Sequence, residues 1–134
     1  MKIEDVEGIG PAFAEKLAAA GVATTDALLD RGATSSGRDK LSEATGISER
    51  LILEWVNHAD LMRIDGVGSE YADLLEAAGV DSCAELAQRN AANLATTFQE
   101  LDAARPNTVR QVPSEATIAK WIEQAEHLAK VVSH

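Results

Sequence analysis

Two short stretches with closely spaced glycines carry the residue types most capable of chemistry. In each stretch two glycines flank one β-branched apolar residue, and an alanine-rich helical pattern follows: Gly8-Ile9-Gly10 and Gly66-Val67-Gly68. Glycine permits a tight turn with unusual φ values, and the apolar residue between the glycines can point inward between two helices. Backbone amides at the start of a helix form a natural anion site. Both turns are therefore candidate phosphate-binding sites, and the competing interpretation is a turn that only closes a pair of helices.

The residues beside both turns do not favour a phosphate. Glu7 and Asp65 directly precede the first glycine of each turn. Carboxylates there repel an incoming anion, most strongly at low salt. The positions after the second glycine hold no Lys or Arg, because they read Pro11-Ala12-Phe13 in one stretch and Ser69-Glu70-Tyr71 in the other. We therefore favour the structural interpretation of the two turns.

Basic residues gather in two polar segments of the chain. The candidate partner-binding residues are three around residues 34–37 and two farther along the chain: Arg31, Arg38, Lys40, Arg105 and Arg110. Asp30 and Asp39 lie among the first three and weaken the field of that cluster. The cluster would suit an acidic peptide or protein surface, because local fields decide docking geometry. A solvated surface segment is the alternative interpretation of both groups.

No residue combination indicates catalysis or a metal site. The three histidines, His58, His127 and His134, have neither metal-ligand spacing nor a nucleophile-base partner, and the first two are expected to be solvated. Cys83 is the single cysteine and is interpreted as a small residue in the first turn of a short helix. The chain has no Gly-Lys-Ser/Thr phosphate loop and no zinc signature. We therefore expect a protein that is not an enzyme and that has no cofactor and no metal.

The two glycine stretches belong to an internal duplication. Residues that follow the first turn recur after the second at a constant offset of 58 positions, so that Gly21 returns as Gly79. Each of these two glycines is predicted to end the helix that precedes it. A later apolar stripe recurs at an offset of 66 positions, so that Trp55 matches Trp121. The second repeat therefore holds eight extra residues between these landmarks, which we place near residues 102–113. Asn93 is expected to cap a helix that continues through Ala104 and is broken by Arg105-Pro106-Asn107.

The duplicated motif resembles the helix-hairpin-helix motif, which reads apolar-x-Gly-apolar-Gly before an alanine-containing helix. The two copies are Val6-Glu7-Gly8-Ile9-Gly10 and Ile64-Asp65-Gly66-Val67-Gly68, and both are closed by a later Gly-Val. The whole chain is similar to an uncharacterised bacterial and archaeal family of tandem helix-hairpin-helix proteins, a domain of unknown function. The motif implies contact with DNA phosphates, commonly with a basic residue after the hairpin, which both copies here lack. The family likeness implies an architecture and no particular activity.

The chain is expected to be all-α, with about eight to ten short helices. Ala and Leu dominate an apolar content of 46%, and only 4% of the residues are aromatic, which favours helices over a β-sandwich. We expect two tandem helix-hairpin-helix repeats, at about 3–63 and 61–130, packed with pseudo-twofold symmetry as a single domain over residues 1–134. Trp55 and Trp121 occupy the centres of apolar stripes and are expected to be buried.

The net charge of −10 is spread evenly, with −5 on residues 1–60 and −5 on residues 61–134. Nucleic-acid affinity draws largely on Lys and Arg that neutralise phosphates, so this balance counts against strong binding. We expect a non-catalytic interaction module that binds another protein, as an adaptor or scaffold. The alternative is a weak or partner-dependent DNA- or RNA-binding protein that uses the hairpin amides on phosphates.

A cytoplasmic location without a membrane partner is also expected. The chain has one cysteine, an acidic beginning without an apolar signal core, and no long apolar run. A single cysteine forms no internal disulfide, and a membrane-spanning helix needs about 18 or more consecutive apolar residues.

Overall fold

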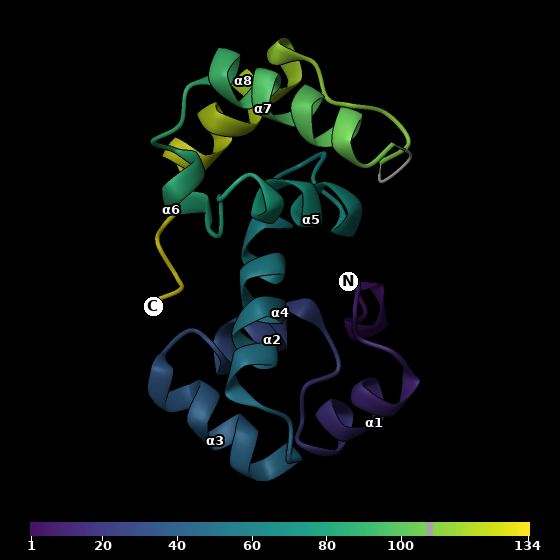
Figure 1. Ribbon diagram of the computed structural model, residues 1–134. Helices are drawn as coiled ribbons and strands as arrows, with labels where there is room; N and C mark the ends of the chain where they lie inside the picture. Colours follow the sequence, from purple (N-terminus) through teal and green to yellow (C-terminus); the bar gives the residue numbers. More distant parts are fainter. Residues whose placement is uncertain (107–108) are drawn as a thin grey trace. The chain divides into compact units, whose positions relative to one another are not determined.

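The computed structural model describes residues 1–106 and 109–134, in which helices joined by short loops make up the fold (Figure 1). They form eight α-helices, one short 3₁₀ helix and no β-strand, although Lys2 and Thr24 make an isolated antiparallel bridge. In chain order the elements are η1 (Ile3–Asp5), α1 (Pro11–Ala19), α2 (Thr25–Arg31), α3 (Ser35–Thr45), α4 (Glu49–Leu61), α5 (Ser69–Ala77), α6 (Cys83–Leu86), α7 (Ala91–Ala104) and α8 (Glu115–Glu126). The expectation of an all-α fold is confirmed for the described residues.

The chain divides into two compact units. Unit 1 consists of Met1–Asp60 together with Lys130–His134, and unit 2 consists of Leu61–Ala129. Unit 1 therefore contains most of the first expected repeat, about 3–63, and unit 2 contains most of the second, about 61–130.

Each unit has an apolar core built from the stripes of its helices. In unit 1, the fully buried leucines Leu17, Leu28 and Leu41 come from α1, α2 and α3. In unit 2, Leu75 of α5 and Phe98 of α7 belong to one continuous cluster of buried side chains. Burial of such side chains stabilises each unit by about 1.5–3 kcal/mol per residue.

Most of the helices begin at a side chain that caps the first turn. The capping oxygens of α2, α3, α6, α7 and α8 each accept a hydrogen bond from the backbone amide three residues later, and they belong to Thr24, Thr34, Ser82, Asn90 and Ser114. These bonds satisfy amides that have no partner within the helix. The expected cap of α7 was Asn93, which is wrong by one turn. Asn90 Oδ1 accepts from Asn93 N–H at 3.1 Å, so the helix begins at Ala91.

Helices α1 and α5 end in the same hydrogen-bond pattern. Gly21 and Gly79 are left-handed, with φ values of 87° and 88°. The N–H groups of Gly21 and Val22 donate back to carbonyls of the last turn of α1 at 3.0 and 2.8 Å, and those of Gly79 and Val80 do so in α5 at 2.9 Å each. These two hydrogen bonds at the end of each helix satisfy carbonyls that the helix leaves unpaired. The predicted helix stops at both glycines are confirmed.

The extra residues of the second repeat fall after α7. The helix ends at Ala104 with Arg105 as its C-cap, in line with the predicted break at Arg105-Pro106-Asn107. Asn107, and therefore part of the predicted insertion at 102–113, lies outside the described residues.

Candidate functional site

The two glycine turns share one backbone geometry. The first glycine of each turn is left-handed, with φ of 93° at Gly8 and 94° at Gly66. The second glycine is extended, with φ of −79° at Gly10 and −92° at Gly68. Only the first glycine of each pair therefore uses a conformation that other residues rarely adopt.

The apolar residue between the glycines anchors each turn. Ile9 and Val67 are each only 4% exposed. Their N–H groups donate to the carbonyls of Val6 and Ile64 at 3.1 and 3.0 Å. The predicted inward orientation of both side chains is confirmed.

A tryptophan lies against each turn. Trp55 and Trp121 are each 2% exposed, which confirms the predicted burial. A Cβ built on Gly8 would lie 3.4 Å from Trp55 Nε1, and one built on Gly66 would lie 3.2 Å from Trp121 Nε1. Each indole also packs on an aromatic ring, with centroids 5.1 Å apart for Phe13–Trp55 and 5.2 Å apart for Tyr71–Trp121. Aromatic pairs of this kind contribute beyond their buried area and hold the turn in position.

Helices α1 and α5 begin directly after these turns without a capping side chain. Gly10 and Gly68 are the N-cap residues, so no N-cap side chain accepts a hydrogen bond from the first amides. Such an end of a helix attracts anions. In α5, however, the first-turn residue Glu70 accepts a hydrogen bond from the Arg110 backbone N–H, which places a carboxylate beside that helix end. A phosphate approaching α5 would therefore meet a negative charge.

Arg31, the last residue of α2, connects α2 to the end of α1 within unit 1. Its Nη1 donates to the Ala20 carbonyl, at the end of α1, at 3.1 Å. Arg89 makes a similar bond in unit 2, from Nη2 to the Gly79 carbonyl at 3.1 Å, one residue beyond the position that corresponds to Ala20. Two arginines separated by the repeat offset of 58 positions thus each donate to a backbone carbonyl directly after the first helix of their repeat.

Arg38 is buried and is fully engaged within unit 1. The residue is only 5% exposed. Its Nη1 donates to the carbonyls of Gly32 and Ala33 at 2.9 and 3.3 Å, and its Nη2 donates to the Ser133 carbonyl at 2.8 Å. Ser133 N–H in turn donates to the Ala33 carbonyl at 2.9 Å, so the guanidinium ties the C-terminal segment to the start of α3. We therefore do not count Arg38 among residues that a partner can reach.

Lys40 is exposed and follows Asp39, a carboxylate that interacts with Glu49. The hydrogen bond with the Asp39 side chain is the main cause that raises the pKa of the Glu49 carboxyl, followed by desolvation and the charge of Asp39. Of the three basic residues expected around 34–37, Arg31 and Arg38 donate to backbone carbonyls, whereas Lys40 is an exposed side chain.

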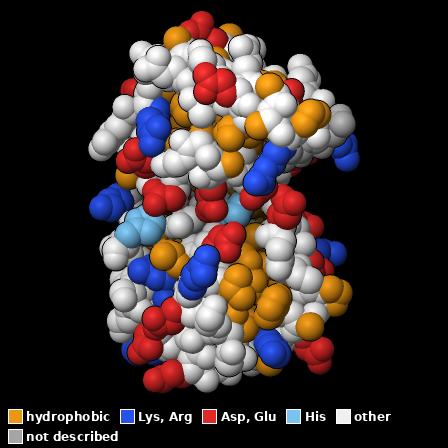
Figure 2. Space-filling model, viewed as in Figure 1, with side chains coloured by type: hydrophobic (Ala, Val, Ile, Leu, Met, Phe, Trp, Pro, Cys, Tyr) orange, Lys and Arg blue, Asp and Glu red, His pale blue; other side chains and the backbone are white. Residues whose placement is uncertain are grey.

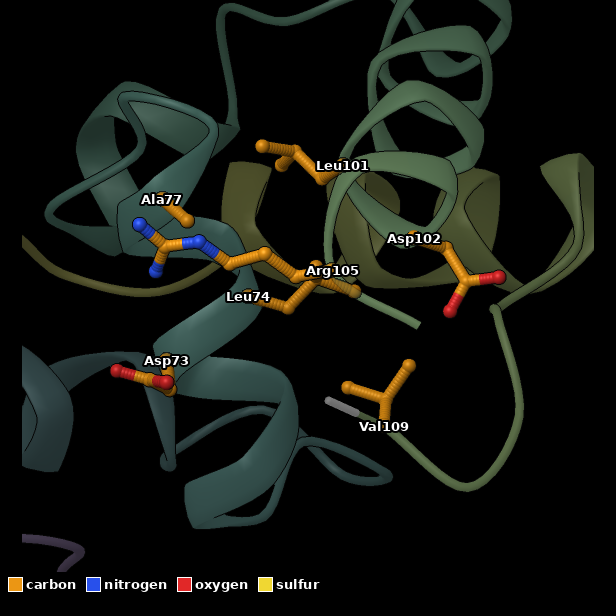
Figure 3. Close-up of a pocket in the computed structure, with 7 residues that line it drawn as sticks. All are labelled: Asp73, Leu74, Ala77, Leu101, Asp102, Arg105 and Val109. Carbon is orange, nitrogen blue, oxygen red and sulfur yellow. The ribbon is translucent and has the colours of Figure 1, made fainter. Parts of the chain in front are cut away.

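A pocket of about 260 Å³ opens in unit 2 (Figure 3). Helices α5 and α7 and the segment after α7 line it with Asp73, Leu74, Ala77, Leu101, Asp102, Arg105 and Val109. Arg105 thus contributes to a pocket with apolar and acidic residues, whereas the other candidate of this region, Arg110, is exposed outside that lining.

A broad groove of about 520 Å³ lies beside the first glycine turn in unit 1. Its lining combines four apolar residues with two carboxylates and consists of Glu4, Ile9, Pro11, Ala14, Glu15 and Ala18. Figure 2 shows hydrophobic side chains gathered at the lower right of the view, where Figure 1 places α1. Apart from Ile9, none of these residues was a candidate from the sequence. Comparison of the two repeats offered a signal, because Pro11 and Ala18 correspond to Ser69 and Glu76.

Helix α4 buries polar residues that periodicity did not identify. Asn57 is 8% exposed, and His58 and Asp60 are each 2% exposed. The expectation of a solvated His58 is wrong, since its Nδ1 lies 2.9 Å from the Glu54 carbonyl oxygen in the preceding turn. His134 Nε2 lies 2.8 Å from Asn57 Oδ1, a second link between α4 and the C-terminal segment of unit 1.

The described residues offer no assembled metal site. Within residues 1–106 and 109–134, no group of three or more His, Cys, Asp and Glu side chains could hold a metal ion. Cys83 is buried at the start of α6. In the same part of the chain, every helix is too short or too polar to cross a membrane.

Comparison with known proteins identifies a family. No curated protein and no solved structure matches the chain. A family model described as Domain of unknown function (DUF4332) matches residues 7–128, which include all eight α-helices. The chain therefore belongs to the DUF4332 family.

Proposed function

We propose that this protein is a non-catalytic interaction module whose unit 1 groove binds a basic, partly apolar segment of another protein. The observation that carries the proposal is the groove beside the first glycine turn. Buried Ile9 and Ala14 supply its floor, and exposed Pro11 and Ala18 continue the apolar surface outward. An amphipathic segment can bury its apolar face against such a groove.

The charge of the groove favours a basic partner. Glu4 and Glu15 are exposed carboxylates of the lining, and the whole chain carries a net charge of −10. The basic cluster that would have suited an acidic partner is reduced, because Arg31 and Arg38 bond to backbone carbonyls. Complementary charge increases the association rate and excludes wrongly charged partners.

The differences between the repeats support one binding face on unit 1. Pro11 and Ala18 of the groove are replaced by Ser69 and Glu76 in the second repeat, whereas the buried Ala14 returns as Ala72. Core residues are thus alike where exposed groove residues differ. This pattern suits recruitment of one copy for binding, with the other copy retained as scaffold.

The scaffold itself is best described as two helix-hairpin-helix repeats. Support comes from the matching left-handed φ values of Gly8 and Gly66, the matching aromatic pairs, and the matching arginine bonds at Arg31 and Arg89. The pseudo-twofold relation of the halves within one domain remains a prediction from the duplication.

Fluorescence anisotropy with a short labelled peptide, in which Lys and Leu recur at helical spacing, tests the proposed function. We expect saturable binding that weakens as salt is raised, since exposed charges are screened. Ala18→Arg should weaken binding by at least about tenfold, because the arginine adds bulk inside the groove and a positive charge that repels the basic peptide. The double variant Glu4→Gln with Glu15→Gln should weaken it by about two- to fivefold.

The matched controls use neighbouring positions and the opposite charge. Ala19→Arg changes the next residue of α1, which is also exposed but does not line the groove, and should bind as the parent does. The same peptide with every Lys replaced by Glu should not bind. Equal losses from the two arginine variants, or equal binding of the Glu peptide, would contradict the proposed groove.

A weak nucleic-acid binder is the second candidate. The favouring observation is that α1 and α5 both begin at glycine N-caps without a capping side chain. Hairpin amides of this kind can contact a phosphate. The carboxylates of Glu7, Asp65 and Glu70 beside these helix ends oppose that use, so we rank it second.

A further inference from the structure

We propose that unit 1 contains a peptide-binding site and that the C-terminal segment, Lys130–His134, is its exchangeable ligand. The segment belongs to unit 1, although the whole of unit 2, Leu61–Ala129, separates it in the sequence from the rest of that unit. All five of its residues are described and lie outside the helices. Its place in unit 1 therefore depends on side-chain packing and hydrogen bonds, as it does for a bound peptide. The inference goes beyond the proposed function and does not depend on the unit 1 groove.

Unit 1 binds both backbone polar groups of Ser133. The Ser133 N–H donates to the Ala33 carbonyl at 2.9 Å, and the Ser133 carbonyl accepts from Arg38 Nη2 at 2.8 Å. Paired main-chain bonds hold an extended peptide whatever its side chains are. Ser133 is exposed, and its hydroxyl adds only a long contact of 3.4 Å to the same Ala33 carbonyl. The site therefore requires a backbone N–H at this position and does not require serine.

A buried apolar side chain supplies the specificity. Val132 is 2% exposed, whereas its neighbour Ser133 is exposed. Successive side chains of an extended chain point in opposite directions, so one residue can enter the unit while the next faces solvent. His134 Nε2 lies 2.8 Å from Asn57 Oδ1 and adds a polar contact. The ligand class is therefore an extended peptide in which a β-branched apolar residue precedes two polar residues.

The site remains organised when the segment leaves. Arg38 Nη1 donates to the carbonyls of Gly32 and Ala33, and these bonds do not involve the segment. A segment with one buried side chain and no helix opens locally at a low cost in free energy. Opening then exposes a guanidinium that is already held in position, which lowers the cost of binding a second peptide of the same sequence.

Release of the segment in the full chain tests the site. Val132→Asp puts a charge where an apolar side chain is buried and should undock the segment. Two-dimensional ¹⁵N–¹H NMR should then show displaced amide signals for Ala33, Arg38 and Asn57. An acetylated peptide with the sequence of residues 129–134 should return these signals to their parental positions. Its Kd should be below about 1 mM, because a tethered segment has an effective concentration in the millimolar range and is docked here.

Substitutions in the peptide separate backbone from side-chain recognition. Ser133→Ala keeps the N–H and should change the Kd by no more than about twofold. Ser133→Pro removes the N–H that binds the Ala33 carbonyl and should weaken binding by at least about tenfold. Val132→Asp in the peptide should weaken it to a similar extent. Lys130→Ala is the control, because Lys130 is exposed, and it should bind as the parent peptide does.

Ser133→Pro in the full chain gives a second protein with a released segment. Its substitution lies at an exposed residue, so the test holds even if Val132→Asp does not fold. Parental signals for Ala33 and Arg38 in both variants before peptide is added would overturn the proposal. A peptide that restores the signals of neither variant, or equal binding of the Ser133→Pro and Ser133→Ala peptides, would do the same. Shifts at Ala14 and Ala18 instead would put this basic peptide in the unit 1 groove, which contradicts the present inference and supports the proposed function.

Discussion

Arg38 shows how a charged residue can become a structural one. Arginine is almost never fully buried unless it is paired. Here the guanidinium is surrounded by the carbonyl oxygens of Gly32, Ala33 and Ser133 at 2.8 to 3.3 Å. Two of these oxygens follow α2 and one belongs to the C-terminal segment, so a single side chain joins parts of unit 1 that lie far apart in the sequence.

We predict that Arg38→Met destabilises the protein by about 2–4 kcal/mol, because buried carbonyls lose charge-assisted hydrogen bonds. Urea unfolding followed by circular dichroism measures the change. Lys40→Met is the control, since it removes the same charge two residues away on an exposed surface, and it should stay within about 0.5 kcal/mol of the parent. Equal effects from the two variants would mean that the Arg38 bonds do not stabilise unit 1.

At the scale of elements, the glycine turn fixes where α1 and α5 begin. The left-handed first glycine reverses the chain, the buried apolar residue anchors it, and the extended second glycine starts the helix. A Cβ at Gly66 would crowd Trp121 Nε1 at 3.2 Å, whereas a Cβ at Gly8 would meet Trp55 Nε1 at an ordinary contact distance of 3.4 Å. The first glycine of each pair is therefore required for its positive φ, whereas the second glycine adopts a conformation that other residues can also adopt.

We predict opposite tolerance at the two positions of the first turn. Gly8→Ala should destabilise the protein by about 1–2 kcal/mol, because a Cβ is unfavourable at positive φ. Gly10→Ala should stay within about 0.5 kcal/mol of the parent. Nothing lies within 4 Å of a Cβ at Gly10, and its φ of −79° is ordinary.

Thermal unfolding of both variants measures this difference, and Gly66→Ala with Gly68→Ala repeats the comparison in unit 2. A loss at Gly10 or Gly68 as large as the loss at Gly8 or Gly66 would contradict the proposed division of roles.

At the scale of the whole molecule, the even negative charge is the property that most restricts partners. Each half carries −5, and neither half has a basic residue directly after its glycine turn. Proteins gain nucleic-acid affinity by releasing counterions from phosphates that their Lys and Arg neutralise. We therefore expect a basic protein segment, rather than a nucleic acid, as the partner.

We predict no binding to random duplex DNA with Kd below about 1 μM at about 150 mM salt, because few cations can neutralise its phosphates. Fluorescence anisotropy with a labelled duplex, over a range of salt concentrations, measures it. The double variant Glu7→Gln with Asp65→Asn should increase any weak binding at low salt, since it removes carboxylates beside both turns.

The control for this experiment removes two charges elsewhere. Asp30→Asn with Glu100→Gln removes the same amount of charge from exposed carboxylates that do not adjoin either turn in the sequence, and it should have a smaller effect. Submicromolar binding by the parent at physiological salt would instead place the nucleic-acid function first.

Much of the local structure could be predicted from the sequence. The helix stops at Gly21 and Gly79, the inward side chains of Ile9 and Val67, and the burial of both tryptophans were all expected and are confirmed. These features depend on glycine conformations, on hydrogen bonds that span a few residues, and on apolar periodicity. Such information is contained in short stretches of chain, which is why the duplication made it visible twice.

The candidate sites depended on contacts between distant residues. Arg38 and Ser133 are 95 positions apart, and no periodic pattern announces that a buried guanidinium will bind that carbonyl. The unit 1 groove joins Glu4 to Ala18, and the unit 2 pocket joins α5 to the segment after α7. The residue types by themselves determined where the helices form. Only tertiary packing decided which charges are buried and which surfaces are hollow, because burial depends on the neighbours that the folded chain brings together.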